Sequence, residues 1–208
     1  MPTGPDTHRR KISEKKRAAI VDAARKNFLT HGYAGAGMAE IAHDADVSTA
    51  TLYKHFASKE ALFAAVVKQV ARSTGDYSGL FTPNDTARDI LYKVCRTYLA
   101  AQFEQDANAL MRIVMAEVPG APQLARETYA ELGTRRIDSF KAVVDQMIAR
   151  GMLRPHDSAF SARIGSGILK EIFVWPALFD KEIGLPPDTD EKIHRCIDCF
   201  MAIFGSED

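Results

Sequence analysis

Residues 38–56 constrain the fold more than any other part of the sequence. They contain two short amphipathic segments, Met38–Ala45 and Thr49–His55, separated by only three residues. Helices of about two turns are not stable alone in water, so both segments need a third helix to pack against. The short break also forces a sharp corner between them. The pattern therefore predicts a helix-turn-helix arrangement.

A packing partner for these segments is predicted on their N-terminal side. Apolar residues recur at four-residue spacing between residues 12 and 31, which indicates an amphipathic helix, and Gly32 is suited to end it. On the C-terminal side, Ser58 is placed to cap a further helix that reaches about Ser73. The apolar positions of the first helix are Ile20, Ala24 and Phe28.

Helical periodicity continues through the rest of the chain, and no strand-like alternation of useful length interrupts it. Pro122 is suited to open one of these helices, Gly133 to kink it and Pro176 to bend a later one. The 208 residues therefore predict an all-α fold. The expected helices cover residues Thr86–Gln105, Ala107–Val118, Gln123–Arg150, Ser158–Asp180 and Thr189–Phe204.

The net charge is zero, but positive charge is concentrated at the N-terminal end. Residues 1–60 contain ten Lys and Arg against seven Asp and Glu, a net charge of +3. Eight of those ten cations lie between Arg9 and Lys26. This asymmetry favours a polyanionic partner at that end of the chain, and a solvated basic tail is the alternative.

The beginning of the second short segment is suited to touch a nucleic acid. Ser48 is placed to cap it, which leaves Thr49, Ala50 and Thr51 at its exposed N-terminal end. In helix-turn-helix modules this end meets base edges in the major groove of DNA. Small side chains let the backbone come close, and Thr supplies a hydroxyl and a methyl group for base contacts.

One ordered run of residues carries a family resemblance. It consists of Glu40-Ile41-Ala42, Ala45-Asp46-Val47-Ser48, Thr51-Leu52-Tyr53-Lys54-His55-Phe56 and Ser58-Lys59-Glu60. With Phe28 and Gly32-Tyr33 before it, this run resembles the N-terminal domain of the TetR/AcrR family of transcriptional regulators, over roughly residues 12–65. The resemblance implies a ligand-responsive regulator that binds a pseudo-palindromic DNA operator, with repression as the expected direction.

The resemblance also implies roles for individual side chains. Thr49, Ala50 and Tyr53 would lie against bases or the sugar-phosphate edge, and the cations that follow would face phosphates. Two alternatives remain, since Tyr53 could pack its ring on the first helix and His55 could be a neutral surface histidine. The DNA-binding candidates are Ser48, Thr49, Ala50, Thr51 and Tyr53, followed by the phosphate-facing Lys54, His55 and Lys59.

The sequence departs from the family pattern at three places. Asp46 occupies the turn position where the family usually has Gly, and we expect it to adopt the left-handed backbone that Asp tolerates. Ala36 and Gly37 precede the first short helix, where many members have a Ser or Thr cap. Ala50 replaces a common Gly, which adds one methyl group at the base-facing surface.

The remaining two-thirds of the chain carries a weaker resemblance. Leu110–Glu117 and Pro122–Arg126 are similar to the C-terminal domains of AcrR-like members, which bind a small molecule and form the dimer. We therefore expect two domains. Residues 1–58 form the basic tail and DNA-binding domain, and residues 59–208, beginning with a linking helix, form the ligand-binding and dimerisation domain.

The last two predicted helices have apolar positions suited to a homodimer interface. Small residues between the isoleucines of the earlier helix permit close approach, and two such helices from each subunit would make a four-helix contact. The alternative is that both helices pack inside the monomer. The interface candidates are Ile164, Ile168 and Ile172, then Ile193, Ile197, Phe200 and Phe204.

A ligand cavity is expected to be concave and mostly apolar, with a few polar groups. Aromatic and Met residues at helical spacing are candidates for its lining, although such residues are more often ordinary core. They would suit a small apolar or aromatic molecule. The candidates are Tyr98, Phe103, Met111, Met115, Met147 and Trp175, with Tyr92, Phe140 and Phe173 as further positions of the same kind.

Two other readings of the sequence remain open. Cys196 and Cys199 share a helix face near His194, so oxidation or a metal could trigger the regulator. Zinc would need further ligands, however, and no complementary cluster is evident. The second alternative is a helical small-molecule-binding protein that does not bind DNA specifically.

Composition excludes several classes of protein. The three cysteines are too few for a disulfide framework and indicate a reducing compartment. No apolar run approaches the roughly 18 residues of a membrane span, and no signal peptide is evident, so we expect a cytoplasmic protein. Phosphate-binding loops and catalytic motifs are absent from the sequence, which predicts neither an enzyme nor a cofactor.

Overall fold

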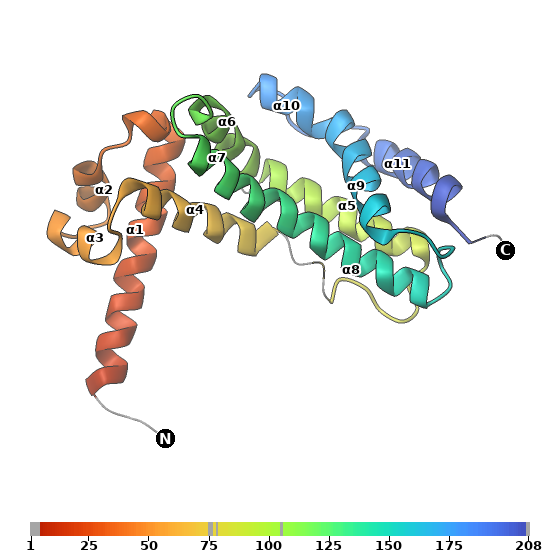
Figure 1. Ribbon diagram of the computed structural model, residues 1–208, viewed down its shortest axis with the longest axis horizontal. Coiled ribbons are helices and arrows are strands. Elements are labelled where there is room, and N and C mark those ends of the chain that lie inside the picture. Colours follow the sequence, from red (N-terminus) through yellow and green to blue (C-terminus); the bar gives the residue numbers. More distant parts are fainter. Residues whose placement is uncertain (1–4, 75–76, 78, 105, 207–208) are drawn as a thin grey trace. The chain divides into compact units, whose positions relative to one another are not determined.

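The computed structural model describes residues 5–74, 77, 79–104 and 106–206. Regular structure in these residues is helical, in agreement with the predicted fold class (Figure 1). The described residues contain no β-strand, and an antiparallel bridge joins Leu153 to Gly205. No described helix is both long and apolar enough to cross a membrane.

The chain divides into two compact units. The N-terminal unit comprises the described residues up to Gln69 together with Ile113–Thr128. The C-terminal unit comprises Val70–Arg112 and the described residues from Tyr129 onward. This division by packing differs from a single cut after residue 58, because a segment distant in sequence joins the N-terminal unit.

The N-terminal unit begins with α1 (Pro5–Gly35), whose helical geometry is broken at Gly32 with a φ of 70°. Then follow α2 (Met38–Asp44), α3 (Thr49–His55) and α4 (Lys59–Thr74), which continues from Val70 into the C-terminal unit. Asp46, in the turn between α2 and α3, has the expected left-handed backbone with a φ of 52°. Gly37 caps α2 without a side-chain hydrogen bond, as its lack of a hydroxyl requires.

Aromatic side chains form the centre of this unit. The ring of Phe28 lies 5.0 Å from that of Phe63 and 5.9 Å from that of Tyr33, measured between centroids. Ile41 of α2 and Leu52 of α3 are fully buried. The two short helices are thus stabilised by packing rather than by their own length, as their sequence requires.

The C-terminal unit packs long helices around one apolar core. Its helices include α5 (Ala87–Phe103), α8 (Arg135–Ala149), α9 (Ser158–Leu169), α10 (Trp175–Phe179) and α11 (Thr189–Phe204). Contacts link α8 to α9, α9 to α11, and α11 to α5. Thr86 caps α5 in a reciprocal pair with Asp89, and Gly151, with a φ of 72°, follows the end of α8. The chain between α5 and α8 forms α6 (Ala107–Glu117) and α7 (Pro122–Tyr129).

Two π-helical segments stand where a kink and a bend were expected. The first, η1 (Ala130–Thr134), contains Gly133 and joins α7 to α8. The second, η2 (Lys170–Val174), joins α9 to α10 and ends just before Pro176. Proline cannot donate the backbone hydrogen bond of a regular helix, so a widened turn before it accommodates the missing donor.

Candidate nucleic-acid interface and internal cavity

The corner between α2 and α3 is built by Ser48. Its backbone is extended, and its Oγ atom accepts a hydrogen bond from the backbone N–H of Thr51 over 3.2 Å. The hydroxyl groups of Ser48 and Thr51 are also hydrogen-bonded to each other, 2.9 Å apart. The cap fixes the first turn of α3. The Thr51 hydroxyl is part of this cap through its hydrogen bond with Ser48.

The outer face of α3 is available to a partner. Thr49, Ala50, Tyr53 and Lys54 are exposed, whereas Leu52 between them is fully buried and anchors the helix. Tyr53 is 49% exposed, so its ring is not part of the core. His55 is half-buried at the end of the helix. A short, capped helix with small residues at its exposed N-terminal end matches the geometry that enters a major groove.

Lys59, the first residue of α4, is tied to its own unit. Its Nζ atom donates a hydrogen bond to the carbonyl oxygen of Ala34 over 3.0 Å and lies 5.0 Å from the centroid of the Tyr33 ring. An ammonium group has three donors, so two remain for a phosphate. Ser58 accepts a hydrogen bond from the backbone N–H of Ala61, which caps α4 as predicted.

Glu60 secures the same region from the other side. The hydroxyl of Tyr33 donates a hydrogen bond to its carboxylate over 2.9 Å. The hydrogen bond with Ser58, followed by that with its own backbone and that of Tyr33, holds the pKa of Glu60 below its usual value. Burial and this bond raise the pKa of Tyr33. The start of α4 is therefore fixed relative to the end of α1.

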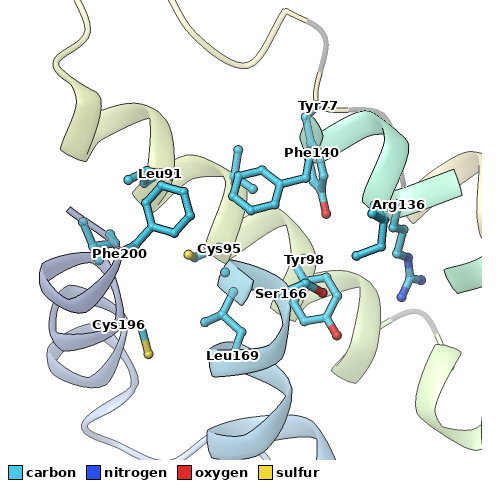
Figure 2. Close-up of a pocket in the computed structure, with 14 residues that line it drawn as sticks. Tyr77, Leu91, Cys95, Tyr98, Arg136, Phe140, Ser166, Leu169, Cys196 and Phe200 are labelled. Atoms are coloured by element: carbon cyan, nitrogen blue, oxygen red, sulfur yellow. The ribbon is translucent and has the colours of Figure 1, made fainter. Parts of the chain in front are cut away.

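The C-terminal unit encloses a cavity of about 40 Å³ with walls from four helices (Figure 2). Ligand pockets have volumes of roughly 300–1,000 Å³, so this cavity can hold a molecule only if its side chains move apart. The rings of Phe140 and Phe200 pack closely on Gly165 in its wall. The lining residues are Tyr77, Leu91, Val94, Cys95, Tyr98, Arg136, Ile137, Phe140, Gly165, Ser166, Leu169, Cys196, Ile197 and Phe200.

The cavity walls are mostly apolar, with a single guanidinium among them. Burial raises the pKa of both Cys95 and Tyr98 to about 12, so both side chains stay neutral. Burial lowers the pKa of Arg136, whose guanidinium lies 5.8 Å from the centroid of the Tyr98 ring. Arg136 was not among the residues predicted to line the cavity, although a cation four positions before Phe140 on an apolar helix face was the available signal.

The cysteines of α11 have different environments. Cys196 is buried in the cavity wall and Cys199 is exposed. Burial raises the pKa of Cys196, whereas reactive thiols have a lowered one. No group of three or more metal-binding side chains occurs among the described residues. These environments do not favour an oxidation or metal trigger at this pair.

The structure brings few of the predicted ligand-binding residues together. Tyr98 lines the cavity, while Phe103 lines a separate groove of about 400 Å³ between the end of α5 and residues 177–185. Met147 is fully buried in the core. Met115 and Trp175 are exposed, and the half-buried Met111 lines neither hollow. For these four the lining assignment stays a prediction, because apolar spacing alone does not distinguish core, surface and cavity wall.

The predicted dimer residues of α11 lie on the side of that helix that its own unit covers. Ile193, Ile197, Phe200 and Phe204 are at most 6% exposed and belong to the core of their own unit. A side chain covered by its own chain offers no surface to a partner, so these four are core residues. Ile164 and Ile168 are half-buried against that core, and Ile172 is 42% exposed.

Comparison with protein families matches most of the chain. Residues 20–66 match the model described as bacterial regulatory proteins, tetR family. Residues 89–206 match the model described as AefR-like transcriptional repressor, C-terminal domain. The chain belongs to the TetR family of transcriptional regulators. It is accordingly a DNA-binding transcriptional regulator, as the sequence analysis predicted.

Similarity to individual transcriptional regulators supports this assignment. The transcriptional regulator RutR of Escherichia coli O157:H7 is 30% identical over 156 residues, which cover 71% of this chain and 68% of RutR. The transcriptional activator FasR of Mycolicibacterium smegmatis is 43% identical over 56 residues, which cover only 27% of this chain and 26% of FasR. Similarity to FasR is thus confined to about a quarter of that protein.

Solved structures of TetR-family regulators share the whole fold. A regulator from Mesorhizobium loti MAFF303099 has a TM-score of 0.82 and 27% identity, over 93% of this chain and 98% of that one. A regulator from Pseudomonas syringae pv. tomato has a TM-score of 0.74 and 24% identity, over 92% and 97% of the two chains.

Proposed function

We propose that this protein is a homodimeric, cytoplasmic repressor that leaves its operator when a small apolar or aromatic molecule occupies the cavity of the C-terminal unit. The observation that carries the proposal is the exposed first turn of α3 on a helix that is capped by Ser48 and anchored by Leu52. The C-terminal match to an AefR-like repressor supports repression as the direction.

Base recognition is assigned to the exposed side chains of α3. Thr49 and Ala50 would approach base edges, and Tyr53 would contact a base or the sugar-phosphate edge. Thr51 is engaged with Ser48, so its part is to hold the cap. Lys54, His55 and the remaining donors of Lys59 would bind phosphates, which set the position of the helix in the groove.

A dimer would place two copies of α3 about 34–36 Å apart, the spacing of successive major grooves, and so read an inverted repeat. The dimer interface is proposed on α9, η2 and α10 rather than on the buried face of α11. Phe160, Ile172 and Trp175 on these elements are 58%, 42% and 44% exposed. Large apolar side chains exposed on successive helical segments are candidates for a protein interface.

The cavity supports the release step. Aromatic rings and protonated thiols suit an apolar or aromatic guest, and Arg136 offers one cation to a polar group on it. Because the cavity is small, a guest would favour a conformation with its walls apart. If that conformation binds the operator less tightly, operator DNA must weaken guest binding by the same factor.

Selection of duplex DNA from a random pool tests the proposal. The purified protein would be used at near-physiological salt without any added small molecule. We expect enrichment of one inverted repeat, which would demonstrate sequence reading and two-fold symmetry together. Binding that is salt-sensitive but indifferent to sequence would contradict the proposal and leave the cavity as the place to look for function.

A further inference from the structure

The cavity of the C-terminal unit is apolar on one side and polar on the other. Leu91 and Phe200 lie on one side of it, and Tyr77, Tyr98 and Arg136 lie on the opposite side (Figure 2). The two tyrosines are only 2% and 5% exposed, so their side chains meet little bulk water. A molecule in this cavity would therefore have two chemically different surroundings, one for each of its ends.

Hydrogen-bond donors and positive charge characterise the polar side. Burial raises the pKa of both Tyr77 and Tyr98, so both phenols keep their protons and can donate a hydrogen bond. The guanidinium of Arg136 adds several N–H donors in one plane, together with its charge. No Asp or Glu occurs among the described residues that line the cavity. The described wall thus offers a guest a cation and donors, but no carboxylate.

A second cation lies near Arg136. Lys170, the first residue of η2, is half-buried. Burial, followed by the charges of Arg136 and Arg163, lowers the pKa of Lys170. These like charges repel one another more strongly in partly buried surroundings than in water. A negative charge on a guest at this side of the cavity would offset the repulsion, which a neutral guest could not do.

We propose that the small molecule bound in this cavity is an organic acid, whose carboxylate is held by Arg136 with the hydroxyl groups of Tyr77 and Tyr98, and whose apolar body lies against Phe140 and Phe200. The inference rests on the proposed function, because it names the chemical class of the molecule that the C-terminal unit binds. A planar guanidinium binds a carboxylate through parallel hydrogen bonds, so this contact would also fix the direction in which the guest enters.

A neutral apolar guest is the alternative, and the two classes predict opposite orders of affinity. A carboxylate that leaves water loses its hydration, which is costly unless new partners replace those hydrogen bonds. In a purely apolar cavity, a neutral molecule would therefore bind more tightly than a carboxylate with the same body. The order is reversed only if the cavity wall supplies charge and donors.

The test compares three probes that share a naphthalene body and differ in the charge of one group. They are 1-naphthoate, 1-naphthylmethanol and 1-naphthylmethylammonium, and calorimetric titration measures their affinity for the full-length protein. Arg136→Met removes the cation of the cavity wall and keeps an unbranched side chain. Arg135→Met is the matched control, because it removes the neighbouring cation of α8, which pairs with Glu131 and does not line the cavity.

We expect the wild type to bind 1-naphthoate about 10- to 100-fold more tightly than the alcohol, and the ammonium probe most weakly. Arg136→Met should abolish or reverse the preference for the carboxylate, while Arg135→Met should retain it. Thermal unfolding of both variants shows whether they are folded. The order of affinities in the wild type is independent of the variants and tests the inference even if Arg136→Met does not fold.

Tighter binding of the alcohol than of 1-naphthoate to the wild type would overturn the inference. An unchanged preference for 1-naphthoate in a folded Arg136→Met variant would do the same. Strong binding of 1-naphthoate that leaves affinity for the selected operator unchanged would instead count against the proposed function, while the inference stands. Failure of all three probes to bind would overturn the inference together with the proposed release step.

Discussion

The side-chain nitrogen of Lys59 and the carbonyl oxygen of Ala34 are joined by a hydrogen bond of 3.0 Å. This bond ties the first residue of α4 to the chain just beyond the break in α1. It also fixes the ammonium group near the base of the helix-turn-helix. The lysine assigned to a phosphate therefore has a structural role in the same unit.

Replacing Lys59 should affect both roles. Lys59→Ala is expected to weaken binding to all DNA sequences alike and to lower the salt slope by about 2 for a dimer. Loss of the hydrogen bond should also lower the free energy of unfolding by roughly 0.5–1.5 kcal/mol. Lys59→Met is the control that keeps an unbranched side chain of similar length but lacks the ammonium group. Quantitative DNA binding over a salt series checks the prediction, and a change confined to one operator base would contradict it.

Thr49 offers a test of base reading. Its side chain is exposed on the first turn of α3, so Thr49→Ala leaves the core and the Ser48 cap in place. We expect altered base preference at one symmetric pair of operator positions, worth about 1–3 kcal/mol at each if the contact is direct. Repeating the selection with the variant measures this. An unchanged preference would remove Thr49 from the site.

Asp46 tests the cost of the left-handed turn. Left-handed backbone costs an L-residue roughly 1–2 kcal/mol, and Asp tolerates it better than most. Asp46→Gly is therefore expected to raise the free energy of unfolding by up to about 1 kcal/mol, while Asp46→Ala should lower it by a similar amount. Urea unfolding of the two variants beside the wild type checks the sign. Equal free energies of unfolding for the Gly and Ala variants would show that the turn changes its backbone conformation to accommodate Ala.

Gly165 tests the packing of the cavity wall. A Cβ atom there would lie 2.9 Å from Cε1 of Phe140 and 3.2 Å from Cδ2 of Phe200. Gly165→Ala should push both rings, destabilise the fold by about 1–3 kcal/mol and reduce binding of an apolar dye. Gly167→Ala is the matched control, since a Cβ there meets nothing within 4 Å. Chemical unfolding and dye titration compare them, and similar behaviour of the two variants would oppose this account.

The proposed interface can be tested by a pair of isoleucines. Ile193 is fully buried, so Ile193→Ala should lower the free energy of unfolding by about 2–5 kcal/mol. Ile172 is 42% exposed, so Ile172→Asp should leave the fold intact and shift the protein from dimer to monomer. Sedimentation and chemical unfolding distinguish these effects. Dissociation of a stably folded Ile193→Ala variant would restore the original assignment of α11 to the interface.

The sequence by itself predicted the features that depend on neighbouring residues. The bounds of α3 and α11, the cap at Ser48 and the left-handed backbone of Asp46 all agree with the structure. Each results from backbone sterics, from a hydrogen bond over a few residues or from helical periodicity. All three depend only on residues that are close together in the sequence. The helix-turn-helix was recognisable for the same reason.

Tertiary structure decided what covers each apolar face. The seam of α11 was correctly read as apolar, but periodicity cannot tell whether a partner or the chain's own core covers it, and Phe200 lies in that core. Trp175 was predicted to line the cavity but is exposed, whereas Arg136 lines the cavity and was not predicted to do so. Burial depends on contacts between residues far apart in sequence, such as Cys95 and Cys196 in one cavity wall, so only the folded chain determines it.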